Sequence, residues 1–255
     1  MIMIKKLNET NSTNSYLKEL VHVQLGQFPN AKSLSKSVPE FFSVMAGYQT
    51  NGRGQQDCCW KSEPNKNALF STLMFPKIHP AQQFYISKIV SLSIIDYIKT
   101  LIPNHKNLSI KWPNDIYYHD RKLAGILIEN SIMGEEILYS VVGIGLNINQ
   151  QYFDSQLPNP ISVSQITELT YDIEDAVKTI INNISFRYAI LLEDIAAYDY
   201  EYEQLLYKKN KEFEYEYNNQ KFLARIKGVN EYGKLLLLKN NCELLECAFK
   251  EVKFL

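Results

Sequence analysis

The chain has 255 residues, of which 45% are apolar and 22% charged, so it can bury a sizeable core and is too apolar to be disordered. Lys plus Arg total 27 and Asp plus Glu total 28, and this balance argues against general nucleic-acid binding, which needs a concentrated positive field. Because no window approaches the roughly 20 apolar residues of a membrane span and residues 1–10 lack the apolar segment of a signal peptide, we expect a cytoplasmic protein with no membrane partner.

The pattern of apolar residues predicts a mixture of helices and strands up to about residue 208. A helix is expected to begin near Asn14, with Ser12 or Thr13 as its N-cap. The other predicted elements, in chain order, are strands at 41–48 and 68–75, a core helix at 80–101, a strand at 108–112, a hairpin of 116–118 and 123–129, a strand at 137–148, and helices of which 173–195 is the longest.

The last part of the chain has a different texture. Short apolar runs, separated by turns rich in Asn and Gly, predict strands at 213–217, 222–229, 234–239 and 244–249. These strands favour a small barrel-like tail. We therefore expect a main domain at 1–208 and a small domain at 209–255 that packs on it, since no low-complexity linker separates them.

The four cysteines occur as the pair Cys58 and Cys59 and as Cys242 and Cys247. This spacing is neither a disulfide framework nor a zinc site. Without an export signal, reduced thiols are expected.

The first of five polar clusters is a loop at 48–56. Gly52 and Gly54 leave its backbone free to bend round a ligand, and Arg53 can make a bidentate contact to a carboxylate or phosphate. A surface turn with a solvated Arg53 is the alternative.

The second cluster precedes the predicted hairpin, and the third begins at the turn of that hairpin. The pentapeptide 111–115 follows a predicted strand, and open α/β sheets bind ligands at such strand ends. Asp115 could accept from a ribose, an amine or a Mg²⁺-bound water, and Lys111 could face a phosphate. Lys122 opens an apolar strand, which would place its ammonium beside buried surface as a point charge for a carboxylate or an α-phosphate. An Asx turn and a solvated hairpin lysine are the alternatives.

The fourth and fifth clusters are weaker on their own. Gly143 and Gly145 interrupt a predicted strand, which indicates close approach of a ligand or another backbone, or else a β-bulge. The hydroxyls and amides of 11–15 could line a pocket for a neutral polar group such as a ureido ring, or could simply cap the helix.

Together and in this order, the clusters resemble the bacterial biotin protein ligase family. The motifs are Ser-Thr-Asn, Gln-x-x-Gly-Arg-Gly, Lys-Trp-Pro-Asn-Asp, Arg-Lys-Leu-Ala-Gly-Ile-Leu and Gly-x-Gly-x-Asn-x-Asn, and they cover 11–149, with a further likeness at 228–237. The resemblance implies an α+β fold: a class II tRNA synthetase-like core, with a mixed β-sheet flanked by helices, and a small SH3-like β-barrel domain at the C-terminus.

The resemblance also implies an activity and its partners. Biotin would be activated with ATP and Mg²⁺ to biotinyl-5'-AMP and then joined to a lysine of a biotin carboxyl carrier domain, in acetyl-CoA carboxylase or another biotin-dependent carboxylase. The implied biotin site consists of Ser12, Thr13, Asn14, Gln49, Gly52, Arg53, Gly54, Gln55 and Lys122. The implied ATP and adenylate side consists of Lys111, Asn114, Asp115 and Asn147. Catalytic roles are implied for Lys122, Arg53, Asp115 and Lys111, with Mg²⁺ near Asp115.

Two departures from the family pattern change what is expected. Gln55 stands where some members carry a basic residue, so this loop would grip phosphates and the adenylate less firmly. Residues 1–10 are too few for the DNA-binding domain of repressor members, so no DNA partner is expected.

Other functions and motions remain open from the sequence. A lipoate or octanoate ligase or transferase of the same superfamily is one alternative, and a non-catalytic vitamin sensor is another; a homodimer is also left open. We further expect loops 52–60 and 150–160 to close over the ligands, with Tyr152 or Phe153 stacking on adenine.

Overall fold

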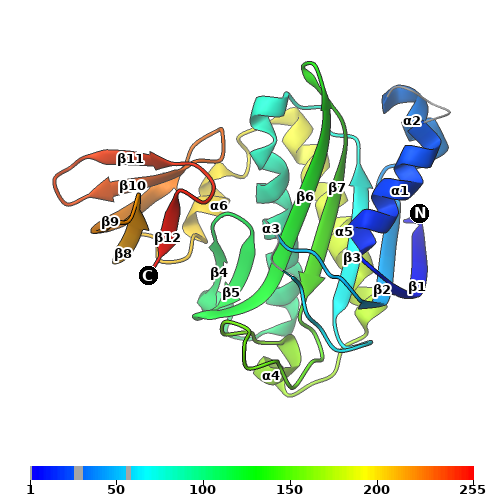
Figure 1. The fold of residues 1–255 in the computed structure, drawn as a ribbon, viewed down its shortest axis with the longest axis horizontal. Helices are drawn as coiled ribbons and strands as arrows, with labels where there is room; N and C mark the ends of the chain where they lie inside the picture. The colour runs from blue at the N-terminus through cyan, green and yellow to red at the C-terminus, as the bar shows by residue number, and fades with distance from the viewer. Residues whose placement is uncertain (1, 26–30, 56–58) are drawn as a thin grey trace.

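The computed structural model describes residues 2–25, 31–55 and 59–255, and its main body is a seven-stranded sheet with helices on both faces (Figure 1). The strand order is β1-β2-β3-β7-β6-β5-β4. β1 pairs with β2 in parallel, and the other neighbours pair antiparallel. The strands are β1 (Ile4–Thr10), β2 (Ser43–Gln49), β3 (Ala68–Met74), β4 (Leu108–Lys111), β5 (Asp115–Tyr118), β6 (Arg121–Met133) and β7 (Glu136–Leu146).

The two faces of this sheet are covered by different helices. α3 (Phe84–Leu101) and α5 (Ile173–Glu193) pack against each other behind the sheet in Figure 1, over the larger apolar core. α1 (Thr13–Leu25) and α2 (Ala31–Ser37) lie on the other face, over a smaller core. A mixed sheet between two helical layers confirms the predicted fold class.

Strand alternation assigns the residues of β7 to the two faces in turn. Val142, Ile144 and Leu146 belong to the core under α3 and α5. Gly143 and Gly145 point the other way, toward Asn14 and Trp60 respectively. The α1 face of the sheet therefore has a stretch without side chains, and this stretch becomes the floor of the candidate site.

The C-terminal part is a five-stranded antiparallel sheet in the order β11-β10-β9-β8-β12. Trp112 of the main body donates from Nε1 to the Gly233 carbonyl at 2.9 Å and meets the Phe249 ring edge-on at 6.0 Å. The predicted tail strands are thus confirmed, whereas their closure into a barrel and the boundary at residue 208 stay predictions. The strands are β8 (Glu212–Tyr217), β9 (Gln220–Val229), β10 (Leu235–Lys239), β11 (Leu244–Cys247) and β12 (Val252–Phe254).

Some elements differ from the predicted pattern. The core helix was predicted to start at Pro80, and this was wrong: Pro80–Gln82 forms a separate 3-10 turn capped by His79, and α3 begins at Phe84. β1 was missed because its strand is mostly polar and exposed. The remaining helices not individually predicted are α2, α4 (Val163–Thr167) and α6 (Asp199–Gln204).

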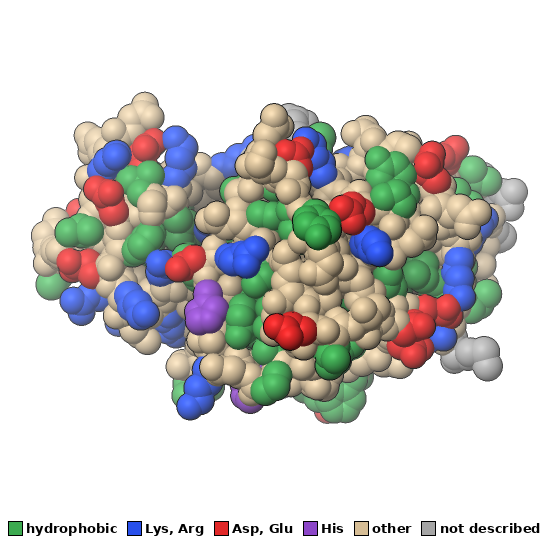
Figure 2. Space-filling view, turned by 90° about the horizontal axis from the view of Figure 1, so that it is seen from below, with side chains coloured by type: hydrophobic (Ala, Val, Ile, Leu, Met, Phe, Trp, Pro, Cys, Tyr) green, Lys and Arg blue, Asp and Glu red, His purple; other side chains and the backbone are tan. Residues whose placement is uncertain are grey.

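The surface is charge-balanced, as the composition predicts. Figure 2 shows positive and negative side chains interspersed over the face seen from below, in keeping with the formal net charge of −1. Within the described part of the chain, no helix is long and apolar enough to cross a bilayer. Cys59, Cys242 and Cys247 carry free thiols.

Candidate ligand-binding site

All five polar clusters contribute to one cavity of about 200 Å³ that lies on the α1 face of β6 and β7. Its walls come from the start of α1, the loop after β2, the start of β5 and the first half of β6. Residues 56–58 of that loop, including Cys58, lie outside the described residues. The lining residues are Ser12, Thr13, Asn14, Gln49, Arg53, Gly54, Gln55, Cys59, Trp60, Asn114, Asp115, Lys122, Gly125, Ile126, Leu127, Gly143, Ile144 and Gly145.

The glycines of β7 let two side chains lie directly on the sheet. A Cβ at Gly143 would stand 2.1 Å from Asn14 Oδ1, and one at Gly145 would stand 2.5 Å from the Trp60 ring. Close approach was predicted at these glycines, and the approaching groups are side chains. Trp60, which the sequence analysis did not single out, forms one wall of the cavity.

Neutral polar groups are held in place at one end of the cavity. Gln49 Oε1 accepts from the Thr13 backbone N–H at 2.7 Å and from the Thr13 hydroxyl at 3.2 Å. The Ser71 hydroxyl lies 2.6 Å from Asn14 Oδ1 and 2.7 Å from Thr13 Oγ1. Thr13 and Asn14 are buried, as is Ser12. This end is therefore preorganised to meet uncharged donors and acceptors, and Ser71 is a member that the sequence motifs did not reveal.

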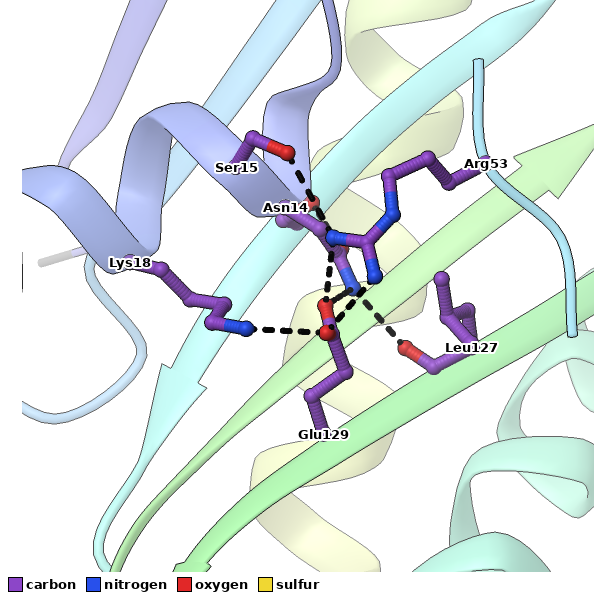
Figure 3. Close-up of polar contacts among 7 residues, drawn as sticks. Asn14, Ser15, Lys18, Arg53, Leu127 and Glu129 are labelled. Atoms are coloured by element: carbon purple, nitrogen blue, oxygen red, sulfur yellow. Dashed lines mark hydrogen bonds and ion pairs between the residues drawn. The ribbon is translucent and has the colours of Figure 1, made fainter. Parts of the chain in front are cut away.

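A carboxylate beside the cavity, that of Glu129, accepts hydrogen bonds from three side chains (Figure 3). It accepts from Asn14 Nδ2 at 2.9 Å, Lys18 Nζ at 2.9 Å and an Arg53 guanidinium nitrogen at 3.0 Å. Burial alone would raise the pKa of the Glu129 carboxyl, but hydrogen bonds from Asn14 and Lys18 and the charges of Lys18 and Arg53 hold that pKa below its usual value. Glu129 therefore stays ionised and ties α1 and the Arg53 loop to β6.

The opposite end of the cavity carries a second ion pair. Lys122 Nζ lies 2.8 Å from Asp115 Oδ1 and 5.8 Å from the centre of the Trp60 ring. Asn114 donates from Nδ2 to the Ile126 carbonyl at 2.8 Å, which anchors the turn after β4 to β6. Arg53 and Lys122 thus line one shared cavity, each already beside a carboxylate.

A second, more apolar cavity of about 400 Å³ adjoins the first. Asn147 lies here, and its side chain donates to the Ile161 carbonyl at 3.1 Å. Tyr152 is 81% exposed, whereas Phe153 lines the cavity. Cys59, Trp60 and Lys122 border both cavities, and the other lining residues are Lys61, Asn147, Phe153, Gln156, Leu157, Pro158 and Pro160.

Two of the predicted site residues do not line these cavities. The Lys111 ammonium lies over the rings of Tyr117 at 5.1 Å, Phe254 at 5.3 Å and Tyr207 at 5.9 Å. Burial lowers the pKa of Lys111, with smaller contributions from neighbouring charges. A phosphate contact by Lys111 stays a prediction, and its side chain points to aromatic rings of the hairpin and the C-terminal region instead.

Gly52 closes the loop rather than lining the cavity. The Trp60 backbone N–H donates to its carbonyl at 2.8 Å, and a Cβ there would lie 2.4 Å from the Trp60 carbonyl oxygen. Its lack of a side chain therefore brings the two ends of the loop together.

The predicted metal position can be tested against the donors present. Across residues 2–25, 31–55 and 59–255, no three His, Cys, Asp or Glu side chains converge on one point. Asp115 Oδ1 is buried and forms the 2.8 Å ion pair with Lys122 Nζ, and a carboxylate oxygen can accept a further contact beside such a pair. Such a site suits Mg²⁺ that arrives with a nucleotide, since this ion is commonly bound by one or two carboxylates plus phosphates.

Comparison with known proteins places this geometry in context. Residues 27–147 match the model of the biotin/lipoate A/B protein ligase family. The chain is 29% identical over 120 residues to the bifunctional ligase/repressor BirA of Bacillus spizizenii, which covers 47% of this chain and 36% of that protein. It is 31% identical over 105 residues to the biotin–[acetyl-CoA-carboxylase] ligase of Paracoccus denitrificans, covering 41% and 43% respectively. The match therefore spans less than half the length of each of these relatives.

Among solved structures, the biotin protein ligase from Aquifex aeolicus in complex with biotin and ATP has the same fold. The two chains superpose with a TM-score of 0.79 at 23% identity, over 100% of each. Residues 27–147 are therefore similar to the biotin/lipoate A/B protein ligase family, and the whole chain shares the fold of this solved structure.

Proposed function

We propose that the chain is a biotin protein ligase, which activates biotin with ATP and joins it to a lysine of an acceptor protein. The observation that carries the proposal is that Lys122 borders both cavities, with Arg53 on the wall of the first. A carboxylate in the first cavity and a phosphate in the second would meet at Lys122. The family match and the names of the relatives support the same activity.

The first cavity suits biotin because it combines neutral polar groups with two cations. The groups of Ser12, Thr13 and Gln49 match a neutral ureido ring, which both donates and accepts hydrogen bonds. Arg53 and Lys122 supply positive charge for the carboxylate. This polar end favours biotin over lipoate, whose ring carries no ureido group.

The second cavity suits the nucleotide. Phe153 offers a ring for the adenine, and Lys122 stands where the α-phosphate would lie. Asn147 is better placed to hold the loop at 150–160 than to bind ATP directly, since its amide already donates to the Ile161 carbonyl.

The proposed reaction has two steps that positioning and charge would accelerate. A biotin carboxylate oxygen attacks the α-phosphorus, and the bond to pyrophosphate breaks; the acceptor amine then attacks the acyl carbon, AMP leaves and the amine loses a proton. The carboxylate is ionised at neutral pH, so Arg53 and Lys122 would orient it and stabilise charge in the transition state. Mg²⁺ bound with ATP would offset charge on the leaving pyrophosphate, with Asp115 as its protein ligand.

Asp115 would orient the acceptor amine rather than deprotonate it. A carboxylate is a poor base for an amine, whose pKa is near 10.4. Trp60 and Phe153 would shield the mixed anhydride from water. We also propose that loops 52–60 and 150–160 close over the mixed anhydride. Proteolysis of both loops should then be slower in the presence of biotin plus ATP. Unchanged proteolysis would refute the closure.

The partners follow from the proposed activity. The acceptor is proposed to be a biotin carboxyl carrier domain of acetyl-CoA carboxylase, in keeping with the name of the Paracoccus denitrificans relative. The cytoplasmic location and the lack of a DNA partner stay predictions, and homodimer formation stays open.

Labelling of an acceptor tests the activity. The chain is co-expressed with a biotin carboxyl carrier domain, and the domain is probed with streptavidin. We expect strong labelling for the natural protein and about a hundredfold less for Lys122→Ala, the usual loss when one charge-stabilising donor is removed. Lys178→Ala, which removes an exposed lysine of α5, is the matched control and should label normally. No labelling by the natural protein, or full labelling by Lys122→Ala, would contradict the proposal.

A further inference from the structure

The Glu129 carboxylate lies beside the cavity, next to its lining residues on β6, and the proposed reaction does not use it. It lies on β6, on the same face as Gly125 and Leu127 of the cavity, because side chains two residues apart share a face of a strand. Only 19% of its side chain is exposed, so it is largely withdrawn from water. A carboxylate in such a position needs compensating partners.

Those partners come from two separate segments. Asn14 and Lys18 reach Glu129 from α1, and Arg53 reaches it from the loop after β2 (Figure 3). Lys18 and Arg53 bind the same carboxylate oxygen, at 2.9 and 3.0 Å. Two cations therefore share one anion, and either could leave without stranding a buried, unpaired charge.

Arg53 is the partner that is free to change its contact. One of its terminal nitrogens makes a 3.0 Å bond to Glu129, while the other makes only long contacts of 3.4 Å to Glu129 and to the Ser15 hydroxyl. The Arg53 side chain is 40% exposed and lines the cavity. A guanidinium has five N–H donors, so most of its capacity remains for an anion in the cavity.

We propose that Glu129 is a positioning residue for Arg53. Glu129 holds the guanidinium against β6 at the edge of the cavity, and Lys18 remains as the counter-ion of Glu129 when Arg53 turns to an incoming carboxylate. The identity of that carboxylate as biotin rests on the proposed function; the holding of Arg53 by Glu129 does not.

Trypsin cleavage after Arg53 tests the holding contact without any ligand. Trypsin must accept the Arg53 side chain in its own pocket, so the Glu129 contact has to open first. In Glu129→Gln, cleavage between Arg53 and Gly54 should rise about fivefold, the effect of losing one partly exposed ion pair on an opening equilibrium. Cleavage after Lys88, which is buried in α3, measures global unfolding in the same digest and should not change.

Glu174→Gln is the matched control for this digest. Glu174 is also a carboxylate held by two lysines, Lys6 and Lys178, but it lies on α5 away from the cavity. Its substitution should leave cleavage after Arg53 unchanged. Equal cleavage after Arg53 in the natural protein and Glu129→Gln, or an equal rise after Lys88, would overturn the proposal.

Kinetics separate positioning from a merely structural role. In biotin-dependent exchange of pyrophosphate into ATP, Glu129→Gln should raise KM for biotin about tenfold and change kcat less than about twofold. In a protein that already carries Arg53→Ala, Glu129→Gln should not raise KM for biotin further, because Glu129 acts on biotin only through Arg53. Additive losses would overturn the proposal. Absence of exchange in the natural protein would instead defeat the proposed function, and the digest would still decide whether Glu129 holds Arg53.

Discussion

The two faces of the main sheet are built from the same strands but for different purposes. On β7, Val142 is fully buried in the core under α3 and α5, while its neighbour Gly143 faces α1 and makes room for Asn14. The face under α3 and α5 is filled with apolar side chains, whereas at Gly143 and Gly145 the α1 face has no side chains, and charged residues lie nearby. Adjacent residues of a strand face opposite sides of the sheet, so one residue can stabilise the core while its neighbour shapes the ligand site.

The largest expected effect is on the filled face. Phe70 of β3 is fully buried in the core under α3 and α5. Phe70→Ala should lower the free energy of unfolding by about 3–5 kcal/mol, from lost apolar burial and the cavity left behind. Denaturant unfolding measures this. A loss below about 1 kcal/mol would mean that this face is not a packed core.

Substitutions at two neighbouring residues of β7 test most sharply whether the two faces of the sheet have different roles. Val142→Ala should cost about 2 kcal/mol of stability and leave biotin affinity unchanged. Gly143→Ala puts a Cβ 2.1 Å from Asn14 Oδ1, so it should displace Asn14 and weaken biotin binding about tenfold, near the lower limit for such overpacking. Calorimetry and denaturant unfolding are needed for both variants. If the two variants changed stability and biotin affinity alike, the two faces would not have different roles.

The smallest expected effect is the pH dependence contributed by Glu129. The folded state lowers the pKa of Glu129 below its ordinary value of 4.5, so the ionised carboxylate favours folding above that pH. This contribution is lost as the pH falls through the folded-state pKa. Because the pair with Arg53 is partly exposed, the loss should be below about 1 kcal/mol.

Acid unfolding of the natural protein and Glu129→Gln measures this contribution. The variant should lose less stability than the natural protein between neutral pH and pH values below 4.5. A steeper loss in the variant would mean that Glu129 does not act as an ionised partner.

Much of the fold and part of the site could be predicted from periodicity and short motifs. The apolar run of β7 and the helical spacing of α3 were visible because burial selects apolar residues along a strand and at regular intervals along a helix. The convergence of Arg53 and Lys122 was expected from a resemblance, and they do line one cavity. Their roles stay predictions.

What could not be predicted depends on contacts between distant segments. Trp60 divides the two cavities because Gly145 lies beneath it, 85 residues further along the chain. Glu129 stands at the end of an apolar run in the sequence. Its role was not apparent there because its partners come from α1 and from the loop that carries Arg53. Lys111 was expected at a phosphate, but rings that include Phe254 near the C-terminus surround its ammonium.

Exchange of labelled pyrophosphate into ATP tests most directly whether the two cavities meet at Lys122. We expect exchange that requires biotin, does not occur with lipoate in its place, and falls about a hundredfold in Lys122→Ala. Exchange that proceeds equally with lipoate, or that survives in Lys122→Ala, would contradict this expectation.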